Sequence, residues 1–410
     1  MEIRFARRMQ HLRASEIREL LKWTQNPAVI SFAGGLPAPE FFPVEEMKAV
    51  TLRLLDELGR QAMQYSTTEG HRPLRDAIAA RMGSRLGVSV RGEEVLITTA
   101  SQQGLDLTGK VFLDEGDAVL CESPTYIGAI NAFRAYQPRF VEVPTDDDGM
   151  IVGELERLLA TTSRVKLVYA IPDFQNPSGR CWSLPRRLAL LELARRHRVP
   201  VVEDSPYYEI RFEGVAVPPL KALDRDGLVI FLGTFSKIFC PGLRVGWLTA
   251  ARPVLERYVL VKQGADLHTS TLSQMEIATY LATYDIDANL QRVRAAYRRR
   301  RDVMLAAIAA AFPPEVRCTR PQGGLFLWAE LPEALNAREV LARCLQREVA
   351  FVPGGGFFPN GGHENTMRLN FSNMPEDSIV EGIHRIGSVL HDMLGTGPDA
   401  LECPARAAAG

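Results

Sequence analysis

The middle of the chain alternates short runs of β-branched and apolar residues with stretches of helical periodicity. Val95–Thr99 predicts a strand, and Gln102–Leu113, where apolar residues recur every three or four positions, predicts the helix that follows it. The further predicted elements, in chain order, are Ala118–Glu122, Thr125–Ala135, Arg139–Val143, Lys166–Ile171, Arg186–His197, Val199–Glu203 and Leu228–Gly233. Leu228–Gly233 is apolar throughout, as is typical of a strand buried on both faces. Strands that alternate with helices predict an α/β fold whose mostly parallel sheet is covered on both sides.

The pattern changes after residue 250. Residues 253–312 are almost wholly helical in pattern, and short strands, a helix, a strand and a last helix follow at Val316–Thr319, Leu325–Glu330, 337–348, Thr366–Phe371 and 376–394. We therefore expect four parts: an N-terminal segment over 1–45, a large domain over 46–290, a smaller α+β domain over 291–394 and a loose tail over 395–410. The four Arg residues at Arg298–Arg301 point around most of a helix, so we expect a solvated or interface face and not a nucleic-acid site.

Composition and charge exclude several classes of protein. The 410 residues include 48 Lys and Arg against 49 Asp and Glu, and a net charge of −1 provides no field that would attract nucleic acid or an anionic membrane. No apolar run is long enough to predict a membrane-spanning helix, and the basic start predicts no secretory signal. The six Cys residues have no metal-ligand spacing, so we expect reduced thiols, no metal site and a cytoplasmic protein.

Lysines are scarce, which leaves few candidates for amine chemistry. The chain has seven of them, at positions 22, 48, 110, 166, 221, 237 and 262. Only Lys237 follows directly from a fully apolar strand, and ligands bind at the carboxyl ends of parallel strands. Desolvation there would favour the neutral amine, which is a nucleophile for aldehydes. The alternative is a lysine that extends to the surface.

Two segments could hold a phosphate group. Thr234, Ser236 and Arg244 surround Lys237 in the sequence, and two hydroxyls with a guanidinium suit a phosphate. Ser101 and Gln102 open the helix after the first predicted strand, where free N–H groups attract anions. By itself, the second segment is only a good helix N-cap.

Two further polar residues follow apolar strands. Asp204 ends the strand in VVEDSPYYE, where a carboxylate without a cationic partner would be costly to bury. Asn176 lies in IPDFQNPSG just beyond another strand, and both residues could also serve as simple caps or turns. Together, a phosphate site, an amine for an aldehyde and a carboxylate for a basic ring nitrogen describe one ligand, pyridoxal 5′-phosphate.

The chain resembles the fold-type I pyridoxal-phosphate-dependent aminotransferases of class I/II. The motifs that carry the resemblance occur in the family's order from about residue 12 to 394 and are ASQQGLDL, SPTYIGA, FQNPSG, VVEDSPYYE, GTFSKIFCPGLRVGW and NTMRLNFS. FAGGLPAPEFFP, KQGADLHT and FVPGGGFFPNGG are similar to the 2-aminoadipate aminotransferases of bacterial lysine biosynthesis, which are relatives of the kynurenine aminotransferases. Ala100 and Ser205 depart from the residues common in relatives, which puts only fine tuning of the ring in doubt.

The resemblance implies catalytic roles for Lys237, Asp204 and Tyr126. Lys237 would bind the cofactor covalently and act as general base, Asp204 would pair with the ring nitrogen, and Tyr126 would stack on the ring. The other cofactor contacts that it implies are Asn176 and Tyr207 at the ring oxygen, Ser101, Gln102, Thr234, Ser236 and Arg244 at the phosphate, and Tyr65 at the phosphate of the other subunit of a homodimer. The resemblance also implies substrate contacts. Arg368 would bind the α-carboxylate, Asn176 would contact the substrate, and Gly34 and Gly35 would let the N-terminal segment lie against it. Ser15 and Arg18 would contact the substrate from the N-terminal helix, with Arg18 at a distal carboxylate.

The implied activity is transamination of an L-amino acid, expected to be 2-aminoadipate with glutamate and 2-oxoglutarate as the partner pair, and with aromatic or leucine-type donors as further candidates. Decarboxylation or β-elimination on the same cofactor is the alternative, because the sequence does not show which bond at Cα stands perpendicular to the ring. A regulator that carries an aminotransferase-like domain is a third class. It is disfavoured because only about 30 residues precede FAGGLPAPEFFP, too few for a DNA-binding domain.

Overall fold

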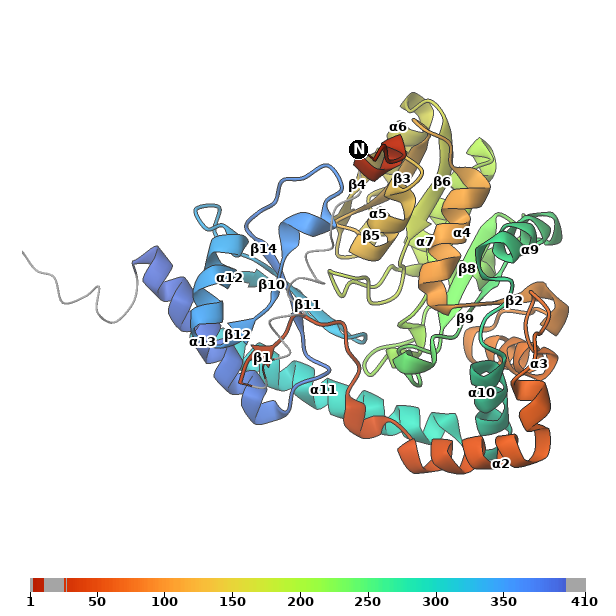
Figure 1. The fold of residues 1–410 in the computed structure, drawn as a ribbon. Coiled ribbons are helices and arrows are strands. Elements are labelled where there is room, and N and C mark those ends of the chain that lie inside the picture. The colour runs from red at the N-terminus through yellow and green to blue at the C-terminus, as the bar shows by residue number, and fades with distance from the viewer. Residues whose placement is uncertain (1–2, 11–25, 27, 396–410) are drawn as a thin grey trace, which may run out of the picture.

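A large, mostly parallel sheet forms the centre of the molecule (Figure 1). The computed structural model describes residues 3–10, 26 and 28–395. Within these residues the sheet has eight strands in the order β2 (Val95–Thr98), β9 (Gly246–Thr249), β8 (Val229–Thr234), β7 (Val201–Asp204), β6 (Val165–Ala170), β3 (Ala118–Ser123), β4 (Arg139–Asp146) and β5 (Gly149–Met150). The pairs from β8 through β4 are parallel, while β9 runs antiparallel to both β2 and β8. The predicted parallel sheet is confirmed, and β9 is an addition that the pattern did not predict.

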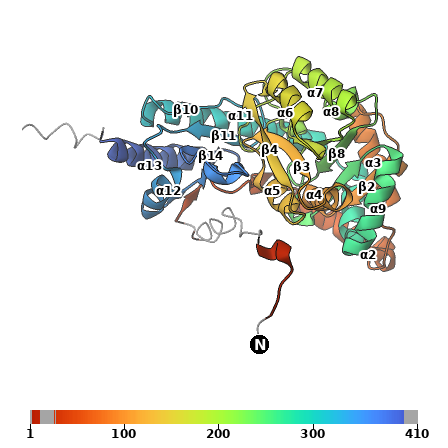
Figure 2. The same ribbon diagram turned by 90° about the horizontal axis from the view of Figure 1, so that it is seen from above.

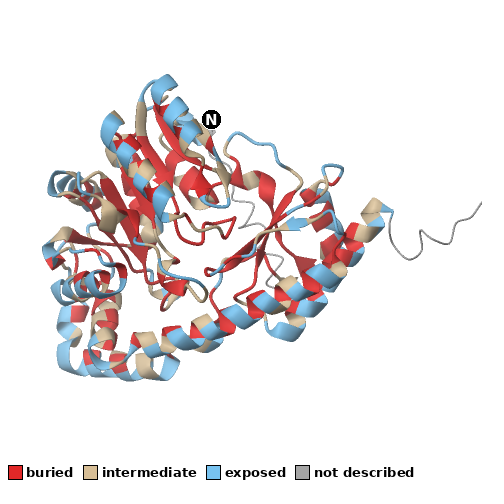
Figure 3. Cartoon of the chain, turned by 180° about the vertical axis from the view of Figure 1, so that it is seen from behind, coloured by how far each residue is buried: buried red, intermediate tan, exposed pale blue. Residues whose placement is uncertain are grey.

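Helices cover both faces of this sheet, as Figure 2 shows from above. One face carries α4 (Ala100–Phe112), α5 (Ile127–Arg134) and α9 (Arg252–Asp266), and the other carries α6 (Val152–Thr161), α7 (Leu184–His197) and α8 (Leu220–Leu223). Alternate strand residues supply the two cores: Val119 and Cys121 pack on the α4 side, and Leu120 packs on the α7 side. This double burial explains why the strands read as continuous apolar runs. The buried residues accordingly lie on the strands and on the inner faces of the helices (Figure 3).

A second, antiparallel sheet lies beside the first (Figure 1). In the described residues its order is β10 (Arg317–Cys318), β11 (Phe326–Glu330), β14 (Thr366–Asn370) and β13 (Val352–Pro353). Close by, β1 (Ile30–Ser31) pairs in parallel with β12 (Val349–Ala350), and α12 (Ala337–Gln346) and α13 (Glu376–Leu394) complete this α+β part. The N-terminal chain therefore adds a strand to the C-terminal part of the protein. The domain boundaries at residues 45, 290 and 394 stay predictions.

The helical region after residue 250 connects the two parts. It contains α9, α10 (Thr271–Thr283) and the long α11 (Ile286–Ala311), which runs along one side of the molecule to the second sheet (Figure 1). Two helices from earlier in the chain, α2 (Val44–Ala62) and α3 (Arg72–Arg81), pack on α10. The sequence pattern did not predict these two helices. The short helical turns are Arg7–Gln10, Pro39–Phe41, Met82–Leu86, Gly92–Glu94, Tyr208–Ile210, Pro241–Leu243 and Gly354–Phe357. No helix in the described ranges combines the length and hydropathy needed to cross a bilayer.

The arginine run on α11 corrects one expectation. Arg298 and Arg299 are exposed, as predicted, but Arg300 and Arg301 are buried. Arg300 donates to the carbonyl of Ser372 and pairs with Glu40, and Arg301 donates to the carbonyl of Pro321 and to Glu213. Two of the four arginines thus tie the long helix to neighbouring loops. Their burial depends on chain segments far away in sequence, so the local charge pattern did not reveal it.

Candidate functional site

The predicted catalytic side chains lie at one edge of the large sheet. Asp204 is the last residue of β7, and Tyr126, Asn176 and Lys237 follow β3, β6 and β8; these four strands are parallel neighbours. Since β2 is antiparallel to β9, and β9 to β8, β2 and β8 run in the same direction. The start of α4, with Ser101, therefore reaches the same edge. The structure brings these residues together as the strand pattern predicted.

Lys237 meets the N-terminal segment. Its Nζ donates a hydrogen bond of 2.8 Å to the carbonyl oxygen of Gly35, a residue 202 positions earlier. A Cβ on Gly35 would lie 3.1 Å from the ring of Phe326, so the segment passes tightly over β11. Burial, followed by the positive charges of Arg368 and Arg244, lowers the pKa of Lys237 to about 8. The amine is therefore partly neutral near neutral pH, as a nucleophile for an aldehyde requires.

Asp204 is fully buried and only half satisfied. Its Oδ2 accepts a hydrogen bond of 2.8 Å from the Tyr169 hydroxyl, and its Oδ1 is buried without a hydrogen-bond partner. Burial raises the pKa of Asp204 to about 6, against the opposing effect of the Tyr169 hydrogen bond. An unpartnered buried carboxylate oxygen is costly and normally marks a missing donor. A protonated ring nitrogen would supply that donor.

Arg368 brings the second sheet into the site from β14. Its guanidinium donates to Asn176 Oδ1 at 2.8 Å and to the carbonyl of Ala33 at 2.7 Å, and its Nε has no partner. The same group lies over the ring of Phe326 at 4.1 Å. No carboxylate in the described part of the chain pairs with Arg368, and burial lowers its pKa to about 10. The site therefore holds an uncompensated cation that suits the carboxylate of an amino acid.

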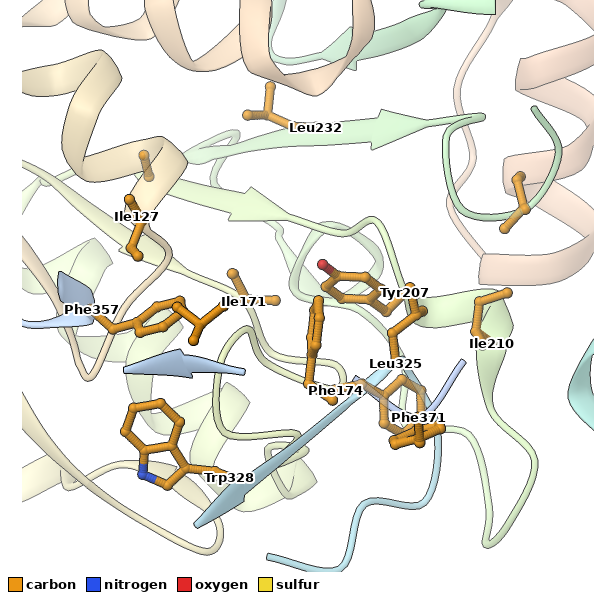
Figure 4. Packing of buried hydrophobic residues seen from close by; sticks show 14 of the residues in the cluster. Ile127, Ile171, Phe174, Tyr207, Ile210, Leu232, Leu325, Trp328, Phe357 and Phe371 are labelled. Atoms are coloured by element: carbon orange, nitrogen blue, oxygen red, sulfur yellow. The ribbon is translucent and has the colours of Figure 1, made fainter. Parts of the chain in front are cut away.

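Asn176 joins Arg368 to the aromatic wall of the site. Its amide nitrogen donates to the hydroxyl of Tyr207 at 3.5 Å, while its oxygen accepts from Arg368. The ring of Tyr207 packs edge-on against Phe326 at 5.9 Å. Figure 4 shows Tyr207 and Phe174 close to Leu325, which leads into β11. Apolar contacts between the two sheets thus set the position of the Asn176 and Tyr207 pair.

Ser236, Thr234 and Ser101 lie where a phosphate could bind. Thr234 donates to Ser236 Oγ at 2.9 Å and accepts from the Ser236 backbone N–H at 3.1 Å, which shapes the turn after β8. Across from it, a Cβ on Gly246 would lie 2.8 Å from the backbone of both Ala100 and Ser101. The start of α4 therefore packs directly on β9, and the free N–H groups of a helix start can bind an anion. Arg244 is exposed, and Gln102 donates to the Gly128 carbonyl at 3.0 Å.

Gly246→Ala should weaken the binding of a phosphate ligand at this turn. The new methyl group would meet backbone atoms, which cannot rotate away as a side chain can, so the start of α4 must shift. We expect the dissociation constant for pyridoxal phosphate to rise about 10-fold, from a strain of about 1–3 kcal/mol. Fluorescence titration of the apoprotein measures this constant. Gly242→Ala is the control, because a Cβ there meets no atom within 4 Å; equal constants for the two variants would contradict the prediction.

The remaining predicted site residues differ in how far the structure tests their placement. Tyr126 is the extended residue before α5, and a Cβ on Gly128 would lie 2.4 Å from its ring, so the glycine lets the ring fold back over the helix start. Tyr65 is 79% exposed and its ring lies 5.8 Å from that of His268. Ser15 and Arg18 lie outside the described residues. Their predicted contacts with substrate therefore stay predictions.

Comparison with known families identifies the architecture. Residues 37–386 match the model of the family described as aminotransferase class I and II. The chain belongs to this family. The expectation of a fold-type I, pyridoxal-phosphate-dependent aminotransferase is thereby confirmed.

Similar proteins cover almost the whole of this aminotransferase. It is 48% identical to a 2-aminoadipate transaminase of Thermus thermophilus, over 95% of this chain and 97% of the relative. A kynurenine aminotransferase of Pyrococcus horikoshii, solved in complex with PMP, superposes with a TM-score of 0.91 at 40% identity, covering 95% of this chain and 97% of that one. The α-aminoadipate aminotransferase LysN of Thermus thermophilus, solved with N-(5′-phosphopyridoxyl)-L-leucine, gives a TM-score of 0.89 at 47% identity, covering 95% and 98%.

The residues of this aminotransferase fit pyridoxal phosphate. The unpartnered Asp204 Oδ1 can accept a hydrogen bond from a protonated ring nitrogen. The lowered pKa of Lys237 makes its amine available to react with an aldehyde. The hydroxyls of Thr234 and Ser236 and the first N–H groups of α4 match a phosphate. In the described residues, no group of three or more His, Cys, Asp or Glu side chains is arranged to hold a metal ion.

Sequence reasoning missed several residues of the site. Tyr169, the partner of Asp204, lies on the adjacent strand β6, and only the pairing of β6 with β7 brings the two side chains together. Phe326 and Phe357 flank the Arg368 guanidinium at 4.1 and 5.1 Å. The one available signal was the tyrosine itself, because a buried hydroxyl within an apolar strand requires a partner.

Proposed function

We propose that this aminotransferase transfers the amino group of L-2-aminoadipate to 2-oxoglutarate, and that it also accepts aromatic or leucine-type donors. The observation that carries the proposal is the pairing of an uncompensated Arg368 with Asn176 beside Lys237 and Asp204. Support for the substrate class comes from the 2-aminoadipate transaminase at 48% identity, and support for breadth comes from the relatives solved with kynurenine and with a phosphopyridoxyl-leucine. A place in lysine biosynthesis is part of the same proposal.

Arg368 and Asn176 orient the amino acid. The remaining N–H donors of the Arg368 guanidinium can pair with the α-carboxylate, with the flanking Phe326 ring excluding water. Because Asn176 and the Ala33 carbonyl hold two of its nitrogens, the guanidinium keeps one orientation when no substrate is bound. A fixed carboxylate site determines which bond at Cα faces the cofactor, and hence the reaction.

Lys237 and Asp204 carry the chemistry. When bound, pyridoxal phosphate supplies a protonated ring that accepts the electron pair released at the substrate Cα. Asp204 Oδ1 would keep the ring nitrogen protonated, because a carboxylate at hydrogen-bond distance favours the cationic form of its partner. The Lys237 amine would first hold the cofactor aldehyde and, once displaced by the substrate amine, remove the proton from Cα.

Capture of pyridoxal phosphate by the apoprotein should accelerate as the pH rises through about 8. Only the neutral amine attacks an aldehyde, and burial with the charges of Arg368 and Arg244 lowers the pKa of Lys237 to about that value. The neutral fraction therefore increases with pH and levels off about one unit higher. Stopped-flow absorbance measures the rate. A rate that continues to rise up to pH 10, as for an exposed lysine, would contradict the assignment.

The proposed activity is tested with a panel of amino donors and 2-oxoglutarate as acceptor. We expect glutamate to form in equal amount to the donor consumed, with the highest kcat/KM for 2-aminoadipate and measurable rates for leucine and aromatic donors. Release of CO2 or ammonia without consumption of the keto acid would favour decarboxylation or β-elimination. The contact between Arg18 and the distal carboxylate, which the resemblance implies, is also part of the proposal. Arg18 lies outside the described residues.

We also propose that two chains share their active sites in a homodimer, with Tyr65 reaching the phosphate site of the partner subunit. Tyr65 is 79% exposed and follows Met63, which is 70% exposed, by two residues, and α2 adds the exposed side chains of Leu52, Leu55 and Leu58. Such a concentration of exposed large apolar side chains is typical of an interface. Analytical ultracentrifugation tests this proposal, and a monomer at micromolar concentration would refute it.

A further inference from the structure

The loop of residues 171–182 delivers Asn176 to the site. It leaves β6, turns at residues 175–180 and returns to α7, and its two ends meet through a hydrogen bond of 2.8 Å from the Trp182 backbone N–H to the Pro172 carbonyl. Within the turn, Gln175 accepts from the backbone and hydroxyl of Ser178 at 2.8 and 2.6 Å. The loop is therefore a compact unit, and its attachment to the sheet determines where Asn176 lies.

Glu122 makes that attachment from the neighbouring strand β3. Its Oε2 accepts a hydrogen bond of 2.9 Å from the backbone N–H of Ile171, at the start of the loop. Its Oε1 accepts another of 2.9 Å from the indole N–H of Trp182, at the end of the loop. Both ends are thus held by the two oxygens of one carboxylate, which is 1% exposed.

The middle of the loop is joined to the same strand end. Gln175 donates to the carbonyl of Pro124 at 2.7 Å, two residues beyond Glu122 and two before Tyr126. The segment that presents Tyr126 and the loop that presents Asn176 are therefore connected at three points. None of the contacts of Glu122 reaches the proposed cofactor or substrate positions themselves.

Burying a carboxylate at the position of Glu122 costs free energy. Burial raises the pKa of Glu122 to about 8, and the N–H groups of Ile171 and Trp182 and the side chain of Gln175 act in the opposite direction. An apolar residue would avoid this cost, but it could not accept two hydrogen bonds from opposite ends of a loop. The arrangement is therefore explained by what the carboxylate positions.

We propose that Glu122 is a positioning residue for transamination: by clamping both ends of the 171–182 loop to β3, it sets the place of the Asn176 amide relative to Arg368, Tyr207 and Tyr126. This inference rests on the proposed function, in which Asn176 orients Arg368, and on the contact between Asn176 and the cofactor ring oxygen that the resemblance implies. Displacement of the Asn176 amide would weaken its hydrogen bond with Arg368 and its contact with the ring oxygen, while the fold persists.

Glu122→Gln and Trp182→Phe test the clamp from its two sides. The amide of the first variant has one acceptor oxygen, so it cannot satisfy both donors, and the second variant removes one donor. Asp117→Asn is the matched control, because Asp117 is a buried carboxylate at the opposite end of β3 that accepts from the Asp114 backbone and the Arg164 guanidinium, both at 2.9 Å. Asn176→Ala is the reference for a missing amide.

The readout is the pH midpoint at which the visible absorbance band of the holoenzyme changes. A hydrogen bond to the ring oxygen influences this midpoint, so Asn176→Ala should shift it by about 1 pH unit. We expect both clamp variants to shift it in the same direction by about half as much, and hydrogen exchange in the peptide of residues 171–182 to accelerate about 10-fold. Asp117→Asn should lower Tm with the midpoint unchanged.

The outcomes separate the inference from the function on which it rests. A shift in Asn176→Ala without a shift in either clamp variant would overturn the role of Glu122 and leave the proposed function in place. An unchanged midpoint in Asn176→Ala would overturn the role of Asn176, and the inference with it. A shift in Asp117→Asn as large as in the clamp variants would show that general destabilisation is the cause, which also overturns the inference.

Discussion

Lys237→Ala should lose roughly 10⁴-fold or more in kcat for transfer from 2-aminoadipate to 2-oxoglutarate. A general base contributes about 10²–10⁴-fold, and the variant also loses the amine that holds the cofactor aldehyde. The cofactor should still bind, because Thr234, Ser236 and the start of α4 are untouched. Steady-state kinetics and an absorbance titration measure the two properties separately.

Borohydride reduction provides the chemical counterpart of this prediction. In the unmodified protein the cofactor should become fixed to the peptide that contains Lys237, and in Lys237→Ala it should be fixed to none. Lys110→Ala is the control variant, since Lys110 lies on the surface of α4 and pairs with Asp106 at 3.0 Å. Label on any other lysine, or a loss of turnover in the control, would refute the assignment.

Asp204→Asn should lower kcat by roughly 10²–10⁴-fold with little loss of fold. The asparagine can still accept from the Tyr169 hydroxyl, but it provides no negative charge for the ring nitrogen. Breaking a buried charged pair costs about 3–5 kcal/mol, which corresponds to this range of rates if the cost falls on the transition state. Stopped-flow measurement of the half-reaction with 2-aminoadipate isolates the affected step.

Glu203→Gln is the matched control for Asp204. Glu203 is also a buried carboxylate on β7, but it accepts from the backbone N–H groups of Leu220 and Lys221, at 2.8 Å each, on the α8 side of the sheet. Its substitution should lower Tm and leave kcat within about threefold. Turnover near normal in Asp204→Asn, or an equal loss in Glu203→Gln, would show that the charge of Asp204 does not support the reaction.

Much of the fold follows from local patterns. Strands that are buried on both faces are apolar at successive positions, so the run Leu228–Gly233, which contains most of β8, stands out against the amphipathic pattern of Arg186–His197. The long helical region after residue 250 is equally clear. The short strand Gly246–Thr249 was missed because a four-residue strand that follows a tight turn leaves no period to detect.

Much of the site follows from the same logic. Lys237, Asp204 and Asn176 were predicted because each is a polar residue at the end of an apolar strand or shortly beyond it, and parallel strands end at one edge. Tyr169 and Glu122 escaped prediction because they lie within strands. Their partners, Asp204 and the ends of the Asn176 loop, are set by which strands are neighbours, and sequence order does not reveal that β3 pairs with β6.

The sequence by itself determined the alternation of elements, the chemistry at the strand ends and the family. The tertiary structure decided the partners. Arg368 contacts Asn176, 192 positions away in the sequence, and Lys237 contacts Gly35, 202 positions away. Arg300 and Arg301 are buried, although a run of four arginines is typical of an exposed helix face. The physical reason is that periodicity and turn chemistry act over a few residues, whereas a buried polar group is satisfied by whatever the packing of distant segments brings within hydrogen-bond distance.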